Sequence, residues 1–128
     1  MSLIRISKYV DRLVLIWKID CLHRYFMNKI SVTIITKNEE KNIRRCLKSI
    51  QWADEIVIVD TFSSDRTVEI CREFTDKVFQ ESWLGYGPQK NLCASKATNT
   101  WVLNLDADEV ISSECAAEIQ KLLLGQPE

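Results

Sequence analysis

Hydrophobic and polar positions follow two different periodic patterns along the chain, and the pattern changes near residue 29. Before that point, apolar residues recur at steps of three and four: Leu3, Ile6, Val10, Leu13 and Trp17. Basic residues recur at similar steps on another face. This spacing predicts a basic amphipathic helix in an N-terminal segment, residues 1–28. It leaves open whether the segment lies on a membrane surface, packs on its own domain, or is a translated leader upstream of a start at Met27.

From residue 29 to residue 128, short β-branched runs alternate with amphipathic stretches. Strands are predicted at 31–36, 55–60, 77–80 and 101–105. Four helices are also predicted. The first follows residue 38 and is capped either by Asn38 or by Thr36 together with Glu39. The next two cover 65–74 and 89–97, and the last begins after a cap at Ser112 or Ser113. This order predicts an α/β fold with a mostly parallel sheet and helices on both faces.

Composition describes an ordinary globular surface with one uneven feature. The 128 residues are 46% hydrophobic and 27% charged, with a net charge of −1, which is enough for one core and gives no basic excess for nucleic acid. Residues 1–29 hold six Lys or Arg and two Asp, so this piece carries +4. Its apolar runs are too short to cross a bilayer, and we expect at most a peripheral contact with an anionic membrane.

The five cysteines lie far apart, with no C-x-x-C pair, and the chain has a single His. A zinc site is therefore poorly supplied with ligands. An odd number of cysteines favours reduced thiols, and most of them fall on predicted helix faces as small buried hydrophobes. We expect a cytoplasmic protein, in contact with the inner face of the membrane if the N-terminal segment binds there.

Polar residues gather where three predicted strands end, at 36–40, 60–65 and 106–109. Ligands of open α/β sheets bind beyond these carboxyl ends. Asp106 and Asp108 are two apart on an extended segment, so both carboxylates can face one ion such as Mg²⁺ or Mn²⁺. The competing interpretation is a solvated turn. Asp60, at the end of its strand, can accept hydrogen bonds from a ribose or a base, whereas Ser64 and Asp65 are typical helix caps.

Several enzyme classes are excluded by missing motifs. Neither G-x-G-x-x-G nor a P-loop is present, which argues against dinucleotide-binding dehydrogenases and P-loop NTPases. A G-x-S-x-G elbow is also missing, and the single His23 lies outside the α/β part, so a hydrolase triad has no base.

Four blocks resemble family 2 glycosyltransferases, which have a GT-A fold, in the family's order and spacing: 33–40, 57–67, 89–91 and 101–109. The Thr-Lys-Asn-Glu-Glu and Leu-Asp-Ala-Asp-Glu runs resemble the subgroup that adds a sugar to the lipopolysaccharide inner core. The resemblance implies an inverting hexosyltransferase that uses a nucleoside-diphosphate sugar, a UDP-sugar above all. The acceptor would be a cell-envelope glycan or a lipid-linked glycan.

The resemblance also assigns roles to particular residues. The nucleotide would contact Thr36, Glu39, Asp60, Lys90 and Asp106. The metal, Mg²⁺ or Mn²⁺, would be held by Asp106 and Asp108. Thr61 stands where many members have a second acidic residue, and Lys37 replaces a common aromatic residue.

The resemblance covers only the N-terminal half of the family's length. The catalytic base of the family comes from a later segment, so we expect this chain to lack it. The alternative hypothesis is a nucleotide-sugar-binding remnant that catalyses no transfer.

Overall fold

The computed structural model describes residues 2–6, 14–18 and 28–125. In this part of the chain six strands form one sheet in the order β1-β2-β6-β3-β4-β5. Their bounds are Ser2–Ile6 (β1), Val14–Lys18 (β2), Ile30–Thr36 (β3), Glu55–Asp60 (β4), Val78–Gln80 (β5) and Trp101–Asp106 (β6). Strands β6, β3, β4 and β5 run parallel to one another, whereas β2 pairs antiparallel with both β1 and β6. The predicted α/β fold with a mostly parallel sheet is confirmed.

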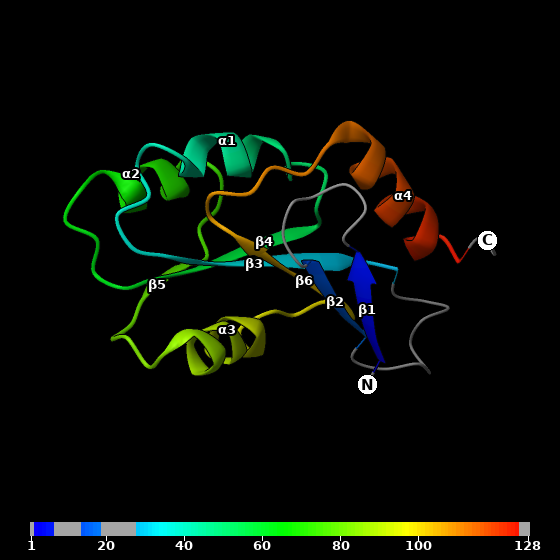
Figure 1. Ribbon diagram of the computed structural model, residues 1–128, viewed down its shortest axis with the longest axis horizontal. Helices are drawn as coiled ribbons and strands as arrows, with labels where there is room; N and C mark the ends of the chain where they lie inside the picture. Colours follow the sequence, from blue (N-terminus) through cyan, green and yellow to red (C-terminus); the bar gives the residue numbers. More distant parts are fainter. Residues whose placement is uncertain (1, 7–13, 19–27, 126–128) are drawn as a thin grey trace.

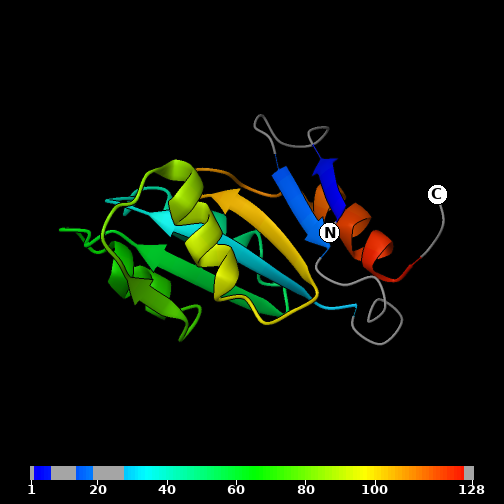
Figure 2. The ribbon, with the colours of Figure 1, turned by 90° about the horizontal axis from the view of Figure 1, so that it is seen from below.

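Four helices cover the two faces of the sheet, as predicted. They are α1 (Ile43–Lys48), α2 (Thr67–Arg72), α3 (Tyr86–Ser95) and α4 (Ser113–Leu123). Figure 1 shows α1, α2 and α4 on one face, and α3 alone on the other. Seen from below, α3 lies over the parallel strands (Figure 2). None of the helices in the described ranges has the length and apolarity needed to cross a membrane.

The core is divided by the alternation of side chains along the strands. In β4, Ile56 and Ile58 pack with α1, α2 and α4, whereas Val57 and Val59 pack beneath α3 against Cys93. Both faces of the central strands are buried, which explains why these runs are almost continuously β-branched. The large core lies on the three-helix face, and α3 closes a smaller one.

The predicted N-terminal helix is wrong where the structure describes this segment. Residues 2–6 and 14–18 are strands that pair with each other, and β2 extends the sheet along β6. Short apolar runs such as Leu3–Ile6 and Val14–Trp17 fit a strand as well as one face of a helix. Pairing with the otherwise open edge of β6 satisfies backbone groups that a separate helix would not reach. Cys21 and His23 lie outside the described residues.

Two helix starts lie three residues or more from their predicted positions, and α2 begins two residues after its predicted start, at Thr67. Helix α1 begins only at Ile43, without a side-chain cap, because Asn38 adopts φ 52° and accepts a hydrogen bond from Ser64 N instead. Helix α3 begins three residues before the predicted start, at Tyr86. The intervening Pro88 lies in its first turn, where a missing N–H costs nothing. For α4 the predicted cap is confirmed, since Ser112 Oγ accepts a hydrogen bond from Cys115 N.

Four cysteines in the described part of the chain are buried and form no disulfide there, as expected for small hydrophobes: Cys46, Cys71, Cys93 and Cys115. Burial raises the pKa of the Cys46, Cys71 and Cys93 thiols to about 12. Thiolate chemistry at these positions is therefore suppressed at neutral pH.

Candidate functional site

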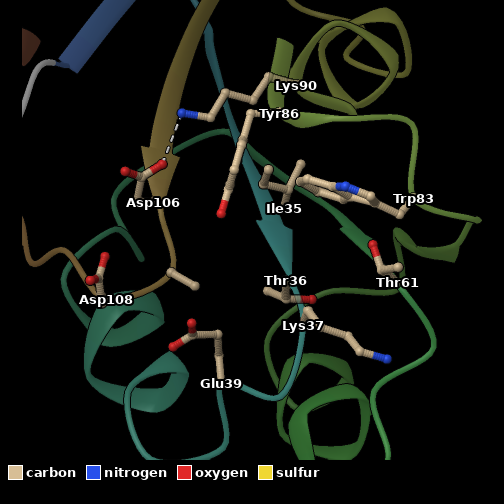
Figure 3. A pocket seen from close by; sticks show the side chains of 11 residues that line it. Ile35, Thr36, Lys37, Glu39, Thr61, Trp83, Tyr86, Lys90, Asp106 and Asp108 are labelled. Atoms are coloured by element: carbon tan, nitrogen blue, oxygen red, sulfur yellow. Dashed lines mark ion pairs between the residues drawn. The ribbon is translucent and has the colours of Figure 1, made fainter. Parts of the chain in front are cut away.

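A pocket of about 840 Å³ opens where β3, β4 and β6 end (Figure 3). Parallel pairing brings these ends together, since Thr36 lies beside Asp60 and Ile35 lies beside Asp106. Its walls are formed by Ile35, Thr36, Lys37, Glu39, Thr61, Trp83, Tyr86, Lys90, Asp106, Ala107 and Asp108. The pocket therefore occupies the edge of the sheet where α/β proteins bind ligands.

Three carboxylates cluster on one side of this pocket. Oxygen atoms of Asp106, Asp108 and Glu109 lie within 4.8 Å of one another. Glu109 Oε1 accepts a hydrogen bond from Asp106 N at 3.0 Å, whereas its Oε2 is buried with no hydrogen-bond partner. Burial raises the pKa of Glu109 to about 7, and the charges of Asp106 and Asp108 contribute to the rise.

This cluster fits a divalent cation. Mg²⁺ and Mn²⁺ prefer oxygen ligands, and a hard cation would relieve both the mutual repulsion of the carboxylates and the unpaired Oε2 of Glu109. The pair predicted from the sequence, Asp106 and Asp108, lies at the cluster. Glu109 joins it because the turn after β6 folds its side chain back onto the Asp106 amide.

Lys90, on the second turn of α3, extends toward the carboxylate cluster. Its Nζ lies 3.0 Å from Asp106 Oδ1, and both side chains are partly exposed, 34% and 26%. Figure 3 shows this ammonium group beside the carboxylate at the end of β6. A flexible cation next to a carboxylate cluster can contact the oxygen atoms of a phosphorylated ligand bound between them.

Asp60 lies at the end of β4 but does not line the pocket. The side chain is fully buried, and its oxygen atoms accept hydrogen bonds from Thr36 Oγ1 at 2.7 Å, Ser63 N at 2.8 Å and Ser63 Oγ at 2.5 Å. Asp60 therefore ties the end of β3 to the turn after β4. A direct contact with a nucleotide stays a prediction, because in this arrangement its hydrogen bonds hold the floor of the pocket.

The loops after β3 and β4 are bonded to each other along their length. Lys37 Nζ donates to Phe62 O, and Asn38 N donates to Ser63 Oγ. Asn38 and Phe62 both have positive φ, at 52° and 47°. These bonds hold two strained residues in place and fix the rim of the pocket.

An aromatic wall, Trp83 and Tyr86, was missed by the sequence interpretation, which treated 83–88 as a plain loop. The two rings meet edge to face, with centroids 4.9 Å apart at 86°. Both residues line the pocket: Trp83 lies on the side away from Asp108, and Tyr86 lies between Trp83 and Asp106 (Figure 3). Two large aromatic residues in a glycine-containing loop next to the predicted site were the available signal.

The structure brings together most of the residues predicted from the sequence. Five of the six line one pocket: Thr36, Glu39, Lys90, Asp106 and Asp108. Asp60 is buried and does not line the pocket. The geometry gives these residues a common location, and their individual roles stay predictions.

Comparison with known proteins agrees with this fold and site. A model of the glycosyl transferase family 2 domain matches residues 31–127. An uncharacterized glycosyltransferase of Rickettsia typhi is 47% identical over 95 residues, which are 73% of this chain and 32% of that protein. The lipopolysaccharide core biosynthesis glycosyltransferase LpsC of Rhizobium meliloti is 32% identical over 104 residues, covering 77% of this chain and 38% of that protein.

Solved structures support the same architecture. The crystal structure of S. aureus TarS 1–349 is 29% identical, with a TM-score of 0.66, over 76% of this chain and 32% of that chain. Glucosyl-3-phosphoglycerate synthase from Mycobacterium tuberculosis is 21% identical with a TM-score of 0.61, over 82% of this chain and 43% of that chain, which supports the fold.

The fold is thus the α/β nucleotide-sugar-binding fold of GT-A glycosyltransferases. The chain belongs to glycosyl transferase family 2. It spans about a third of the length of the curated relatives it matches.

Proposed function

We propose that this chain is the donor-binding part of an inverting glycosyltransferase that takes a hexose from a UDP-sugar. The observation that carries the proposal is the carboxylate cluster at the end of β6, with Lys90 beside it in a pocket large enough for a small organic ligand. TarS, 27% identical, has been solved in complex with UDP, which supports a uridine nucleotide as the donor carrier.

Within this proposal the residues of the pocket have separate tasks. Asp106 and Asp108 hold a divalent cation, Mg²⁺ or Mn²⁺, and when bound this ion neutralises charge on the departing diphosphate. Lys90 contacts diphosphate oxygen atoms from the α3 side. Thr36 and Glu39 line the nucleoside side of the pocket. Asp60 keeps Thr36 in position through the 2.7 Å hydrogen bond.

The acceptor is proposed to be the core of a lipopolysaccharide or another cell-envelope glycan. Support comes from the 32% identity with LpsC, a lipopolysaccharide core biosynthesis glycosyltransferase. Such a reaction would take place in the cytoplasm, at the inner face of the membrane. A carboxylate base that activates the acceptor hydroxyl would come from a segment beyond this chain.

Donor binding is tested by calorimetry with a UDP-sugar, with and without Mn²⁺. We expect binding that depends on the metal, and we expect Asp108→Ala to lose the metal-dependent part. The matched control is Glu114→Ala, which removes an exposed carboxylate from the first turn of α4 and should leave binding unchanged. Equal affinity in the Asp108→Ala variant would contradict the proposed site.

A second experiment separates the transferase from a binding remnant. If purified chain with metal, UDP-sugar and a deacylated core acceptor transfers sugar, and Asp106→Ala abolishes the transfer, the base is present after all. Donor binding without transfer supports a requirement for the rest of the protein, because general base catalysis contributes about 10² to 10⁴ in rate. Restoring transfer by adding a longer form of the protein would then exclude the remnant.

A further inference from the structure

Trp83 and Tyr86 stand out because large aromatic rings are exposed beside a polar pocket. The two residues are 48% and 75% exposed, although both line the pocket. Figure 3 shows Trp83 across the pocket from Asp106 and Asp108, with Tyr86 between Trp83 and Asp106. An exposed aromatic pair at a pocket of this kind indicates a contact with a ligand that has a flat apolar face.

The loop that carries the pair is fixed from below by Gln89. This side chain is fully buried, its Oε1 accepts a hydrogen bond from Leu84 N at 3.0 Å, and its Nε2 donates to Thr61 Oγ1 at 3.3 Å. Gly85 supplies the turn with φ 100°, a conformation that favours glycine. The rings are therefore held at the end of β4 rather than left on a free loop.

The strand order places Asp106 and Thr61 at opposite sides of the pocket, and Figure 3 shows Trp83 on the side of Thr61. Asp106 ends β6, Thr61 follows β4, and β3 lies between them. Neighbouring strands are about 4.8 Å apart, so two spacings separate the two sides by about 10 Å. This span suits an extended nucleotide whose diphosphate lies at the carboxylates and whose base lies at the ring of Trp83.

We propose that Trp83 stacks on the heterocyclic base of the donor nucleotide, with Tyr86 holding the indole by its edge-to-face contact. The inference rests on the proposed function and adds the residue that recognises the base. The transferred sugar is attached to the diphosphate and would lie near Asp106 and Asp108, which leaves the base as the part that reaches Trp83. Every base has a π-face, so this contact contributes affinity rather than a choice among bases.

The test compares two ligands that share a diphosphate, UDP and inorganic pyrophosphate, titrated calorimetrically into the chain at fixed Mn²⁺. Trp83→Ala should weaken UDP by roughly 5- to 100-fold, the range expected for one stacked base. Pyrophosphate should bind with unchanged affinity, because it does not reach the ring. Trp83→Phe should retain most of the UDP affinity. Leu84→Ala, a neighbouring exposed residue that does not line the pocket, is the matched control and should have no effect.

The possible outcomes distinguish stacking of Trp83 on the base from a general effect on the pocket and from a failure of the proposed function. Equal weakening of UDP and pyrophosphate would mean that Trp83 shapes the whole pocket, and this would overturn the stacking. Unchanged UDP affinity in Trp83→Ala, with Asp108→Ala still losing metal-dependent binding, would also overturn it and indicate that the rings are covered by another part of the full-length protein. If the unsubstituted chain fails to bind UDP, the proposed function itself fails, and the stacking fails with it.

Discussion

Buried or half-buried carboxylates lie at both ends of the parallel strands, but their surroundings differ between the two ends. At the amino end, Glu55 accepts hydrogen bonds from Ser31 Oγ, Thr98 N and Thr98 Oγ1, and it pairs with Lys77. At the carboxyl end, three carboxylates crowd together, and Glu109 keeps a buried oxygen atom without a hydrogen-bond partner. The first arrangement stabilises the fold, whereas the second brings like charges together and is the proposed site of the divalent cation.

The pKa values of Glu55 and Glu109 differ in the same way between the two ends of the strands. Burial alone would raise the pKa of Glu55, but the hydrogen bonds from Lys77, Ser31 and Thr98 outweigh it and lower the pKa to about 2. Burial raises the pKa of Glu109 to about 7, and the charges of the neighbouring aspartates add to the rise. A carboxylate surrounded by donors thus supports folding at neutral pH, and a carboxylate surrounded by carboxylates opposes it.

The largest expected effect is at the amino end. Glu55→Ala should lower the free energy of unfolding by about 4 kcal/mol, because it leaves a fully buried Ser31 hydroxyl and the Thr98 amide without their acceptor. Urea denaturation measures the loss. The control is Glu73→Ala, which breaks the exposed pair with Arg44 and should cost less than about 1 kcal/mol. Similar losses in the two variants would remove the basis of the comparison.

Acid should act on the same residue. The folded-state pKa of Glu55 lies below its ordinary value of 4.5, so its stabilisation is complete above about pH 4.5 and disappears as the pH falls toward about 2. The shift corresponds to a loss of about 3 kcal/mol. Unfolding free energies of the unsubstituted chain and of Glu55→Gln should therefore converge over this range. A constant difference between them down to pH 2 would contradict the assignment.

A smaller effect is expected at the aromatic wall. Gln89→Leu keeps the volume but removes the hydrogen bonds to Leu84 N and Thr61 Oγ1, which should cost about 1–2 kcal/mol of stability. It should also weaken UDP more than pyrophosphate, since Trp83 is no longer held over the base. Thermal unfolding and calorimetry measure the two quantities. A loss of stability with unchanged selectivity between the ligands would assign Gln89 to the fold alone.

The smallest effect separates the two ends most directly. Asp108→Asn should raise stability by about 0.5 kcal/mol in the absence of divalent metal, because it removes one like charge from the cluster. Adding Mn²⁺ should stabilise the unsubstituted chain and have less effect on the variant. Destabilisation of the metal-free variant would show that Asp108 supports the fold, as Glu55 does.

Much of the fold was predictable because the central strands carry continuous β-branched runs. The bounds of β3 and β4 agree with prediction to within one residue, and β6 ends at Asp106, where the polar cluster begins. The N-terminal strands were not predictable, since a short apolar run takes its conformation from an available partner. Here that partner is the edge of β6, eighty residues or more along the chain.

The site was predictable only in part, for a related reason. Asp106 and Asp108 follow a strand directly, so their location could be inferred from local sequence. The burial of Asp60 could not, because it depends on Thr36, which lies on the neighbouring strand. The role of Gln89 in fixing Leu84 likewise arises from the way α3 packs over the end of β4.

The bonded loops after β3 and β4 bear on how affinity for the donor could change. Lys37, Asn38, Phe62 and Ser63 hold one another through hydrogen bonds between the loops, and two of them have positive φ. A substitution on one loop would therefore disturb its counterpart, so single changes there should be poorly tolerated. The aromatic loop is attached mainly through Gln89 and carries exposed side chains. A search for altered donor affinity in the laboratory should consequently find tolerated changes in residues 82–86, while the two bonded loops change only in concert.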